Sequence, residues 1–331
     1  MTLVRRSFIT ASAALPFAGA ALAEALPPTP VAGDAAAPVW PSPERIVLWP
    51  EGPPGAPAQL PVYSATMHGP QGARQIWVTG IASPDISIFR PRHPTGEALL
   101  VFPGGGYEFL AVQNEGTEIA RRFNAYGITV CVLSYRLPGE GWANRERVPL
   151  QDAQRAMRLL RASADELGID TARIGILGFS AGGHLAADFA TAFDEPCYTP
   201  LGEVDKASAR PAFAGLIYPV ASFREGVHAG SRDHLLGSDA SPELILAHSP
   251  ADHVRPDTPP CFIAHAMDDK TVPVEASLAM ISGCRKAGVP VEAHLFAEGG
   301  HGFGLRSTLD LPAAQWPDLF LTWMRSQKDM V

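Results

Sequence analysis

The feature that most constrains this chain is a short apolar run, residues 174–177, that leads directly into Gly178-Phe179-Ser180-Ala181-Gly182. A strand that turns sharply into a helix needs residues without bulk on both sides of the turn, and glycines flanking a serine meet that need. Such a turn lifts the serine Oγ clear of the backbone at the carboxyl edge of a sheet. The same pattern also occurs in ordinary turns rich in glycine and serine, so it predicts a nucleophile only together with partners for the serine.

Apolar strand patterns and helical patterns alternate along the chain. The predicted buried strands are 98–102, 128–135, 174–177, 213–218, 261–266 and 291–297. The predicted helices are 117–126, 150–167 and 274–286, each closed by a glycine. Residues 75–81 and 86–90 are predicted to be antiparallel strands that precede them. Alternating strands and helices of these lengths predict an α/β fold, with a mostly parallel twisted sheet and helices on both faces.

The segment 219–260 shows little periodicity, apart from a predicted short helix near 242–248. A connection of that length beside the carboxyl edge of a sheet is more often functional than merely a spacer.

The amino terminus has the features of an export signal. Arg5 and Arg6 precede Ser7-Phe8-Ile9, a modestly apolar stretch follows, and Ala21-Leu22-Ala23 places small residues before a cleavage point. We therefore expect a twin-arginine-type signal peptide over residues 1–23, removed after Ala23. The expected partner is the twin-arginine export machinery, and the expected location is periplasmic or secreted.

One folded domain is expected after the signal. Residues 24–45 are rich in proline and alanine and lack periodicity, which predicts a linker or an arm lying over the surface. Residues 46–331 are expected to form a single domain, since large α/β folds commonly reach this size. The apolar part of the signal is too short to span a bilayer, so no stable membrane insertion is expected.

Charge and composition argue against nucleic acid as a partner and against a metal site. Of the 331 residues 46% are hydrophobic and 18% are charged, with a formal net charge of −8. A moderately acidic surface argues against nucleic acid as a partner. No Cys-x-x-Cys or His-x-x-x-His spacing indicates a metal site, and no cofactor is expected. The four cysteines predict no particular disulfide pair: Cys131, Cys197, Cys261 and Cys284.

The serine finds candidate partners downstream in the order expected for a nucleophile, an acid and a base. A serine hydroxyl needs an imidazole to take its proton and a carboxylate to orient that imidazole. His301 lies in Gly299-Gly300-His301-Gly302-Phe303-Gly304, directly after the predicted strand 291–297. Asp269 follows the strand 261–266 and precedes Lys270-Thr271-Val272-Pro273. Asp268 is the alternative acid.

The chain contains other histidines that are alternatives to His301. His184 lies four residues after Ser180, so on a helix it would lie one turn below the serine and be poorly placed to accept its proton. The further alternatives are His228, His234, His248, His253, His265 and His294.

A glycine-rich segment, Pro103-Gly104-Gly105-Gly106-Tyr107, follows the predicted strand 98–102. Its glycines allow main-chain N–H groups to point at a developing oxyanion, together with the N–H of Ala181. The alternative is a phosphate-binding loop. The absence of Gly-x-Gly-x-x-Gly spacing, of a lysine and of an acidic ribose partner argues against that alternative.

Four segments resemble the α/β-hydrolase esterases that carry an HGGG-type loop. They are Pro-Gly-Gly-Gly-Tyr at 103–107, Ser-Tyr-Arg-Leu-Pro at 134–138, Gly-Phe-Ser-Ala-Gly-Gly-His-Leu-Ala at 178–186, and Gly-His-Gly-Phe-Gly at 300–304. The closest resemblance is to bacterial secreted esterases of the acetyl xylan esterase and feruloyl esterase kind, and it implies an α/β-hydrolase domain.

The resemblance also implies roles. Ser180 would be the nucleophile, Asp269 would orient His301, and His301 would act as acid and base. Gly105, Gly106 and Ala181 would donate to the oxyanion. Pro103 stands where the HGGG-type loop has histidine, which departs from the hormone-sensitive-lipase-like branch, and the large amino-terminal cap of that branch is not evident.

The expected activity is hydrolysis of short-chain acyl esters, acetyl above all, on small-molecule or oligosaccharide substrates derived from plant carbohydrate. Tyr107, Arg136 and Phe223 are candidates for the wall of the substrate pocket, although Arg136 is equally suited to a salt bridge with Asp152. The alternatives are a feruloyl or other small-ester esterase, an exported peptidase of the prolyl-oligopeptidase type, and an inactive hydrolase fold used for binding.

Overall fold

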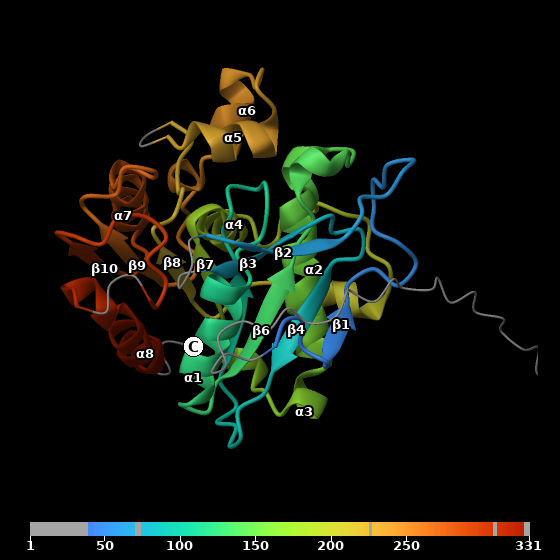
Figure 1. Ribbon diagram of the computed structural model, residues 1–331, viewed down its shortest axis with the longest axis horizontal. Helices are drawn as coiled ribbons and strands as arrows, with labels where there is room; N and C mark the ends of the chain where they lie inside the picture. The colour runs from blue at the N-terminus through green and yellow to red at the C-terminus, as the bar shows by residue number, and fades with distance from the viewer. Residues whose placement is uncertain (1–38, 70–73, 225–226, 307–309, 328–331) are drawn as a thin grey trace, which may run out of the picture.

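A central sheet organises the described part of the molecule, which in this computed structural model comprises residues 39–69, 74–224, 227–306 and 310–327 (Figure 1). Within these ranges the sheet has eight strands in the order β1-β4-β6-β5-β7-β8-β9-β10. The strands are β1 (Arg45–Val47), β4 (Asp85–Phe89), β5 (Ala98–Phe102), β6 (Thr129–Ser134), β7 (Ile174–Phe179), β8 (Ala214–Ile217), β9 (Cys261–Ala266) and β10 (Val291–Phe296). Strands β5 to β10 run parallel, whereas β4 pairs antiparallel with both β1 and β6. The predicted mostly parallel sheet is confirmed.

Helices cover both faces of this sheet. They are α1 (Glu118–Asn124), α2 (Val148–Ala162), α3 (Ala164–Leu167), α4 (Ser180–Thr191), α5 (Ala229–Leu236), α6 (Pro242–Ala247), α7 (Glu275–Ala287) and α8 (Trp316–Ser326). Successive residues of a strand point to opposite faces. In β7, a Cβ on Gly178 would lie 2.6 Å from Ala186 Cβ of α4, whereas the Phe179 ring lies 5.8 Å from the ring of Trp316 at the start of α8. Helices α4 and α8 therefore lie on opposite faces.

The carboxyl edge of the parallel strands carries the long insertion between β8 and β9. Helices α5 and α6 stand together at the top of Figure 1, at the end of the molecule opposite α3. The predicted helix near 242–248 corresponds to α6, but α5 was not predicted. Its only large apolar residues are Leu235 and Leu236, next to each other, so no helical periodicity marks it in the sequence.

Two other boundaries differ from the prediction. The helix expected over 150–167 is interrupted at Ser163, whose φ of −98° and ψ of 9° end α2 before α3 begins. The predicted strand 75–81 is β3 (Gln75–Thr79), which pairs antiparallel with β2 (Ser64–His68) in a separate two-stranded sheet.

The folded domain begins before residue 46. Trp40 is buried, and Ser42 Oγ donates a hydrogen bond to the Ile88 carbonyl at 2.6 Å. The last residues of the predicted arm therefore pack against β4. The predicted signal peptide, and the arm up to residue 38, lie outside the described residues.

Three further properties concern the described ranges. None of the helices there is both long enough and apolar enough to cross a membrane. No group of three His, Cys, Asp or Glu side chains in those ranges is arranged to hold a metal ion. The four cysteines are all buried, and none forms a disulfide with another described residue.

Candidate active site

The turn from β7 into α4 has the tight geometry of a nucleophile elbow. Ser180 has a φ of +52°, a left-handed backbone conformation that is strained in a residue with a side chain. A Cβ on Gly178 would lie 2.2 Å from the Gly182 carbonyl oxygen, and one on Gly182 would lie 2.1 Å from that of Phe102. Only glycine fits at both positions, which allows the helix to start this close to β5 and β7.

The structure brings Ser180, His301 and Asp269 together in one chain of hydrogen bonds. Ser180 Oγ lies 2.9 Å from His301 Nε2, and His301 Nδ1 donates to Asp269 Oδ2 at 2.7 Å. With Nδ1 donating, Nε2 is the acceptor that faces the serine hydroxyl. The arrangement can therefore take a proton from Ser180 and stabilise the resulting imidazolium.

The Asp269 side chain is fully buried and accepts several hydrogen bonds. Its Oδ1 accepts from the main-chain N–H groups of Thr271 and Val272, both at 2.9 Å. Burial alone would raise the pKa of this carboxyl, but hydrogen bonds from His265 and His301 outweigh burial and hold the pKa well below its usual range. Asp269 is thus kept as an anion beside His301.

The alternative acid, Asp268, has a different contact. Its Oδ1 accepts from the Gly300 N–H at 2.8 Å, and the residue is exposed. Asp268 therefore holds the loop that carries His301, whereas Asp269 contacts the imidazole directly.

His265 supports the acid, a role that was not predicted for it. It is fully buried, and its Nε2 donates to Asp269 Oδ2 at 3.2 Å and to the Val272 carbonyl at 3.0 Å. Its Nδ1 lies 2.7 Å from Ser277 Oγ of α7. The position of a histidine inside β9, four residues before the acid, was the signal available in the sequence.

The glycine loop after β5 provides main-chain donors next to the serine. Gly105 and Gly106 have φ values of +126° and +64°, which turn the loop back on itself. Within the described ranges, neither of their N–H groups donates a hydrogen bond, whereas Gly104 N–H donates to Glu115 Oε2 at 2.6 Å. The Ala181 N–H lies in the first turn of α4, where N–H groups have no partner within the helix. These three groups are suited to an oxyanion.

Two of the three candidates for the pocket wall surround a buried histidine instead. Tyr107 donates its hydroxyl proton to His184 Nδ1 at 2.8 Å, and the Phe223 ring stacks on the imidazole with ring centroids 4.4 Å apart. His184 Nε2 donates to the His248 carbonyl at 2.9 Å. Burial lowers the pKa of His184 to about 3, so this imidazole is neutral. Tyr107 and Phe223 are themselves buried and hold His184 beneath the elbow.

The third candidate, Arg136, is not available to a ligand, which corrects its placement in the pocket wall. Its side chain is fully buried and forms an ion pair with Asp152, with Nη2 2.8 Å from Oδ1. The same guanidinium donates to Gln151 and to the Pro54 carbonyl. The salt bridge named as the alternative is the arrangement found.

Helix α5 lies over the glycine loop. His234 Nδ1 donates to the Gly106 carbonyl at 2.9 Å, and a Cβ on Gly106 would lie 3.9 Å from Ser231 Oγ and 4.0 Å from His228 Cε1. The insertion between β8 and β9 therefore forms one side of the site, as its length suggested.

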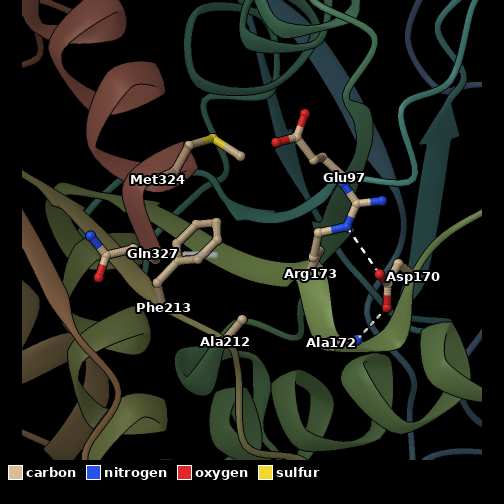
Figure 2. Close-up of a pocket in the computed structure, with 8 residues that line it drawn as sticks. All are labelled: Glu97, Asp170, Ala172, Arg173, Ala212, Phe213, Met324 and Gln327. Carbon is tan, nitrogen blue, oxygen red and sulfur yellow. Dashed lines mark hydrogen bonds and ion pairs between the residues drawn. The ribbon is translucent and has the colours of Figure 1, made fainter. Parts of the chain in front are cut away.

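A cavity of about 350 Å³ lies at the other edge of the sheet (Figure 2). The residues that line it include Glu97, directly before β5, and Arg173, directly before β7. The cavity therefore lies at the amino ends of these strands, whereas Ser180 lies at their carboxyl ends. Figure 2 shows the Arg173 guanidinium paired with Asp170, at 3.0 Å. The cavity is separate from the arrangement around Ser180.

Comparison with known proteins shows the family to which the chain belongs. Residues 86–283 match the model of the BD-FAE family, a span that includes Ser180 and Asp269 and ends before His301. The chain belongs to the BD-FAE family of α/β-hydrolases. The resemblance expected from the sequence motifs is confirmed.

Two relatives of this BD-FAE family member are named as an esterase and as a xylanase. An acetylxylan esterase of Xylanibacter ruminicola is 35% identical over 65% of this chain and 43% of its own length. The endo-1,4-beta-xylanase B of Butyrivibrio fibrisolvens is 34% identical over 62% of this chain and 32% of its own length. The chain thus spans less than half the length of these curated relatives.

A solved structure extends the similarity over the whole fold. The acetyl ester-xyloside bifunctional hydrolase from Caldicellulosiruptor lactoaceticus is 36% identical, with a TM-score of 0.70, over 86% of this chain and 97% of that one. These comparisons support the expected enzyme class, a serine hydrolase acting on ester bonds.

Proposed function

We propose that this BD-FAE family member is a serine carboxylesterase that removes short acyl groups, acetyl above all, from carbohydrate. The observation that carries the proposal is the chain of hydrogen bonds from Ser180 through His301 to Asp269, beside a glycine loop with main-chain donors. Neither a metal nor a cofactor is needed for this chemistry.

In the acylation step, Ser180 Oγ attacks the ester carbonyl carbon while His301 Nε2 takes the hydroxyl proton. The carbonyl oxygen becomes an oxyanion and accepts hydrogen bonds from the N–H groups of Gly105, Gly106 and Ala181. One such donor contributes roughly 3 kcal/mol to stabilising the transition state. His301 then gives its proton to the departing sugar oxygen, and the carbonyl re-forms as an acyl-enzyme.

In the deacylation step, water takes the place of the sugar alcohol. His301 Nε2 accepts a proton from the water as the oxygen attacks the acyl carbon, and the same donors hold the second oxyanion. The proton returns to Ser180 Oγ as the carboxylic acid leaves, and the acid then ionises in water. Asp269 stays ionised throughout and stabilises the imidazolium in both steps.

The names of the relatives and the proposed export of the chain both support acetylated carbohydrate as the substrate. The relatives are named as an acetylxylan esterase, a xylanase and an acetyl ester-xyloside hydrolase. In addition, the proposed export of the chain through its twin-arginine-type signal would place the enzyme where plant polysaccharides and oligosaccharides occur.

Chromogenic esters test the reaction and its acyl preference. We expect hydrolysis of 4-nitrophenyl acetate with higher kcat/KM than the butyrate or octanoate ester, and no cleavage of a proline 4-nitroanilide. Preference for octanoate would refute the acetylesterase proposal, and anilide cleavage would favour a peptidase. Acetate release from acetylated xylan, compared with ferulate release from feruloylated arabinoxylan, then separates the two carbohydrate esterase activities.

Export is tested on the full chain expressed in a bacterium with a twin-arginine pathway. We expect the periplasmic fraction to contain a protein that begins at Glu24. A variant with Arg5→Lys and Arg6→Lys is expected to stay in the cytoplasm. Equal export of both proteins would refute the twin-arginine assignment.

A further inference from the structure

The segment between the glycine loop and α1 contains a π-helix, η1 (Gln113–Thr117). Such helices are rare and occur frequently at functional sites. In this protein η1 carries two adjacent polar residues, Asn114 and Glu115, whose side chains contact both loops of the active site.

Glu115 lies behind the glycine loop. The residue is 4% exposed, yet it carries a carboxylate, and both of its oxygens have partners. Oε2 accepts from the Gly104 N–H at 2.6 Å, and Oε1 accepts from the Tyr218 hydroxyl at 2.8 Å. A Cβ on Gly104 would lie 2.8 Å from Glu115 Oε2 and 2.9 Å from Ser180 Cβ, so this contact lies directly beside the serine.

Tyr218 connects Glu115 to the loop that carries His301. Its hydroxyl oxygen accepts from the Gly304 N–H at 3.2 Å, and its ring meets the His301 imidazole edge-on with centroids 5.1 Å apart. Tyr218 is fully buried and has a φ of +38°, a conformation that a non-glycine residue adopts at a cost in energy. The backbone is strained where it directs this ring against His301.

Asn114 forms a second connection to the same loop. Its Nδ2 donates to the Gly302 carbonyl at 3.2 Å. A Cβ on Gly304 would lie 2.3 Å from Asn114 Oδ1, so η1 and the His301 loop approach each other closely.

We infer that Glu115 and Tyr218 are positioning residues that hold the oxyanion donors and His301 in a fixed relation to Ser180. Glu115 fixes the glycine loop through Gly104, and leaves Gly105 and Gly106 to face the substrate. Tyr218 transmits the same restraint to Gly304 and to the His301 ring. The inference rests on the proposed esterase function.

The charge of Glu115 also acts on His301. Both oxygens accept hydrogen bonds, which favours the ionised carboxylate, although burial raises its pKa above the ordinary value. The groups that face His301 are Asp269 after β9, Tyr218 after β8 and Glu115 on η1. His228, directly before α5, also interacts electrostatically with His301. Loss of the Glu115 charge therefore acts on the surroundings of the imidazole as well as on the glycine loop.

Two conservative variants test the inference by different routes. Glu115→Gln removes the charge but keeps the shape, and Tyr218→Phe removes the hydroxyl but keeps the ring and the Glu115 charge. With 4-nitrophenyl acetate, each is expected to lower kcat by about 10- to 100-fold with little change in KM, since small misplacements of reacting groups have effects of that size.

Glu108→Gln serves as the matched control, because Glu108 is exposed on the same loop and its substitution removes an equal charge. It is expected to leave kcat unchanged. Unchanged kcat in both E115Q and Y218F would overturn the inference, as would an equal loss of kcat in E108Q. If E115Q fails to fold, the test rests on Y218F: a lower kcat at constant KM supports the inference, and an unchanged kcat overturns it. Ser180→Ala, assayed alongside, distinguishes failure of this inference from failure of the proposed esterase function.

Discussion

Replacement of Asp269 by asparagine is the most informative change at the site, because it alters one atom in a network that the structure describes fully. The N–H groups of Thr271 and Val272 both lie 2.9 Å from Asp269 Oδ1, and the Oδ1 of an asparagine can still accept from them. Its Nδ2 would then lie where Asp269 Oδ2 lies, 2.7 Å from His301 Nδ1. An amide N–H there is a donor, so the imidazole must accept at Nδ1 and carry its proton on Nε2.

The consequence for catalysis follows from that tautomer. With a proton on Nε2, His301 presents a donor to Ser180 Oγ, 2.9 Å away, and cannot take the serine proton. The anion that stabilises the imidazolium is lost as well. A change of this kind costs about 10⁴-fold in kcat, or about 5 kcal/mol of transition-state stabilisation. The fold should persist, since the side chain keeps its size and both main-chain hydrogen bonds.

Asp268→Asn is the matched control, because Asn can keep the hydrogen bond that Asp268 accepts from Gly300 N–H. We expect D268N to retain kcat within about 3-fold, as surface substitutions have small effects. Both variants are assayed with 4-nitrophenyl acetate, with thermal unfolding followed in parallel. A larger loss in D268N than in D269N, or a D269N loss below about 10-fold, would refute this reasoning.

Three further predictions concern the loop, the buried ion pair and pH. Gly104→Ala would place a Cβ 2.7 Å from the Phe179 carbonyl oxygen, and should lower kcat at least 10-fold by displacing the oxyanion donors; unchanged kcat would contradict this. Arg136→Ala leaves the buried Asp152 carboxylate without its ion-pair partner, and should lower the free energy of unfolding measured in urea by about 3–5 kcal/mol. Arg224→Ala, which removes one partner of an exposed ion pair, should lower it by less than about 1 kcal/mol. Burial raises the pKa of Asp188 from 3.8 to about 7, so in that window the folded protein binds a proton that the unfolded chain has lost. The free energy of unfolding of the wild type therefore falls as pH rises through the window. Asp188→Asn should lack this fall, so its free energy of unfolding relative to the wild type should rise by up to about 4 kcal/mol between pH 4 and pH 8. The same difference between variant and wild type at both pH values would contradict the raised pKa.

The elements that could be predicted from the sequence are those whose pattern is local. Strands β5 and β7 are apolar runs, and β9, apolar apart from His265, was predicted at the bounds found, Cys261–Ala266. The elbow and the glycine loop are short segments whose backbone geometry depends on glycines within them. Ser180, Asp269 and His301 each follow a strand of the parallel sheet, namely β7, β9 and β10, so the sequence could predict that they meet at one edge of the sheet.

The parts that could not be predicted depend on contacts between distant segments. Glu115 and Tyr218 are 103 residues apart, and no motif joins them. Tyr107 and Phe223 were expected to face the substrate, but both pack around His184, because an aromatic residue near a catalytic motif can serve the core equally well. Helix α5 was not predicted because its only large apolar residues, Leu235 and Leu236, are adjacent and give no helical periodicity.

Covalent labelling of Ser180 tests the central claim most directly. The intact protein is treated with a fluorophosphonate, which captures an activated serine, and the labelled peptide is identified by mass spectrometry alongside Ser180→Ala and His301→Ala. We predict one label per chain, on Ser180, complete loss of 4-nitrophenyl acetate hydrolysis on labelling, and no label in either variant. A label on another serine, or a Ser180→Ala protein that still hydrolyses the acetate ester at the wild-type rate, would contradict the account.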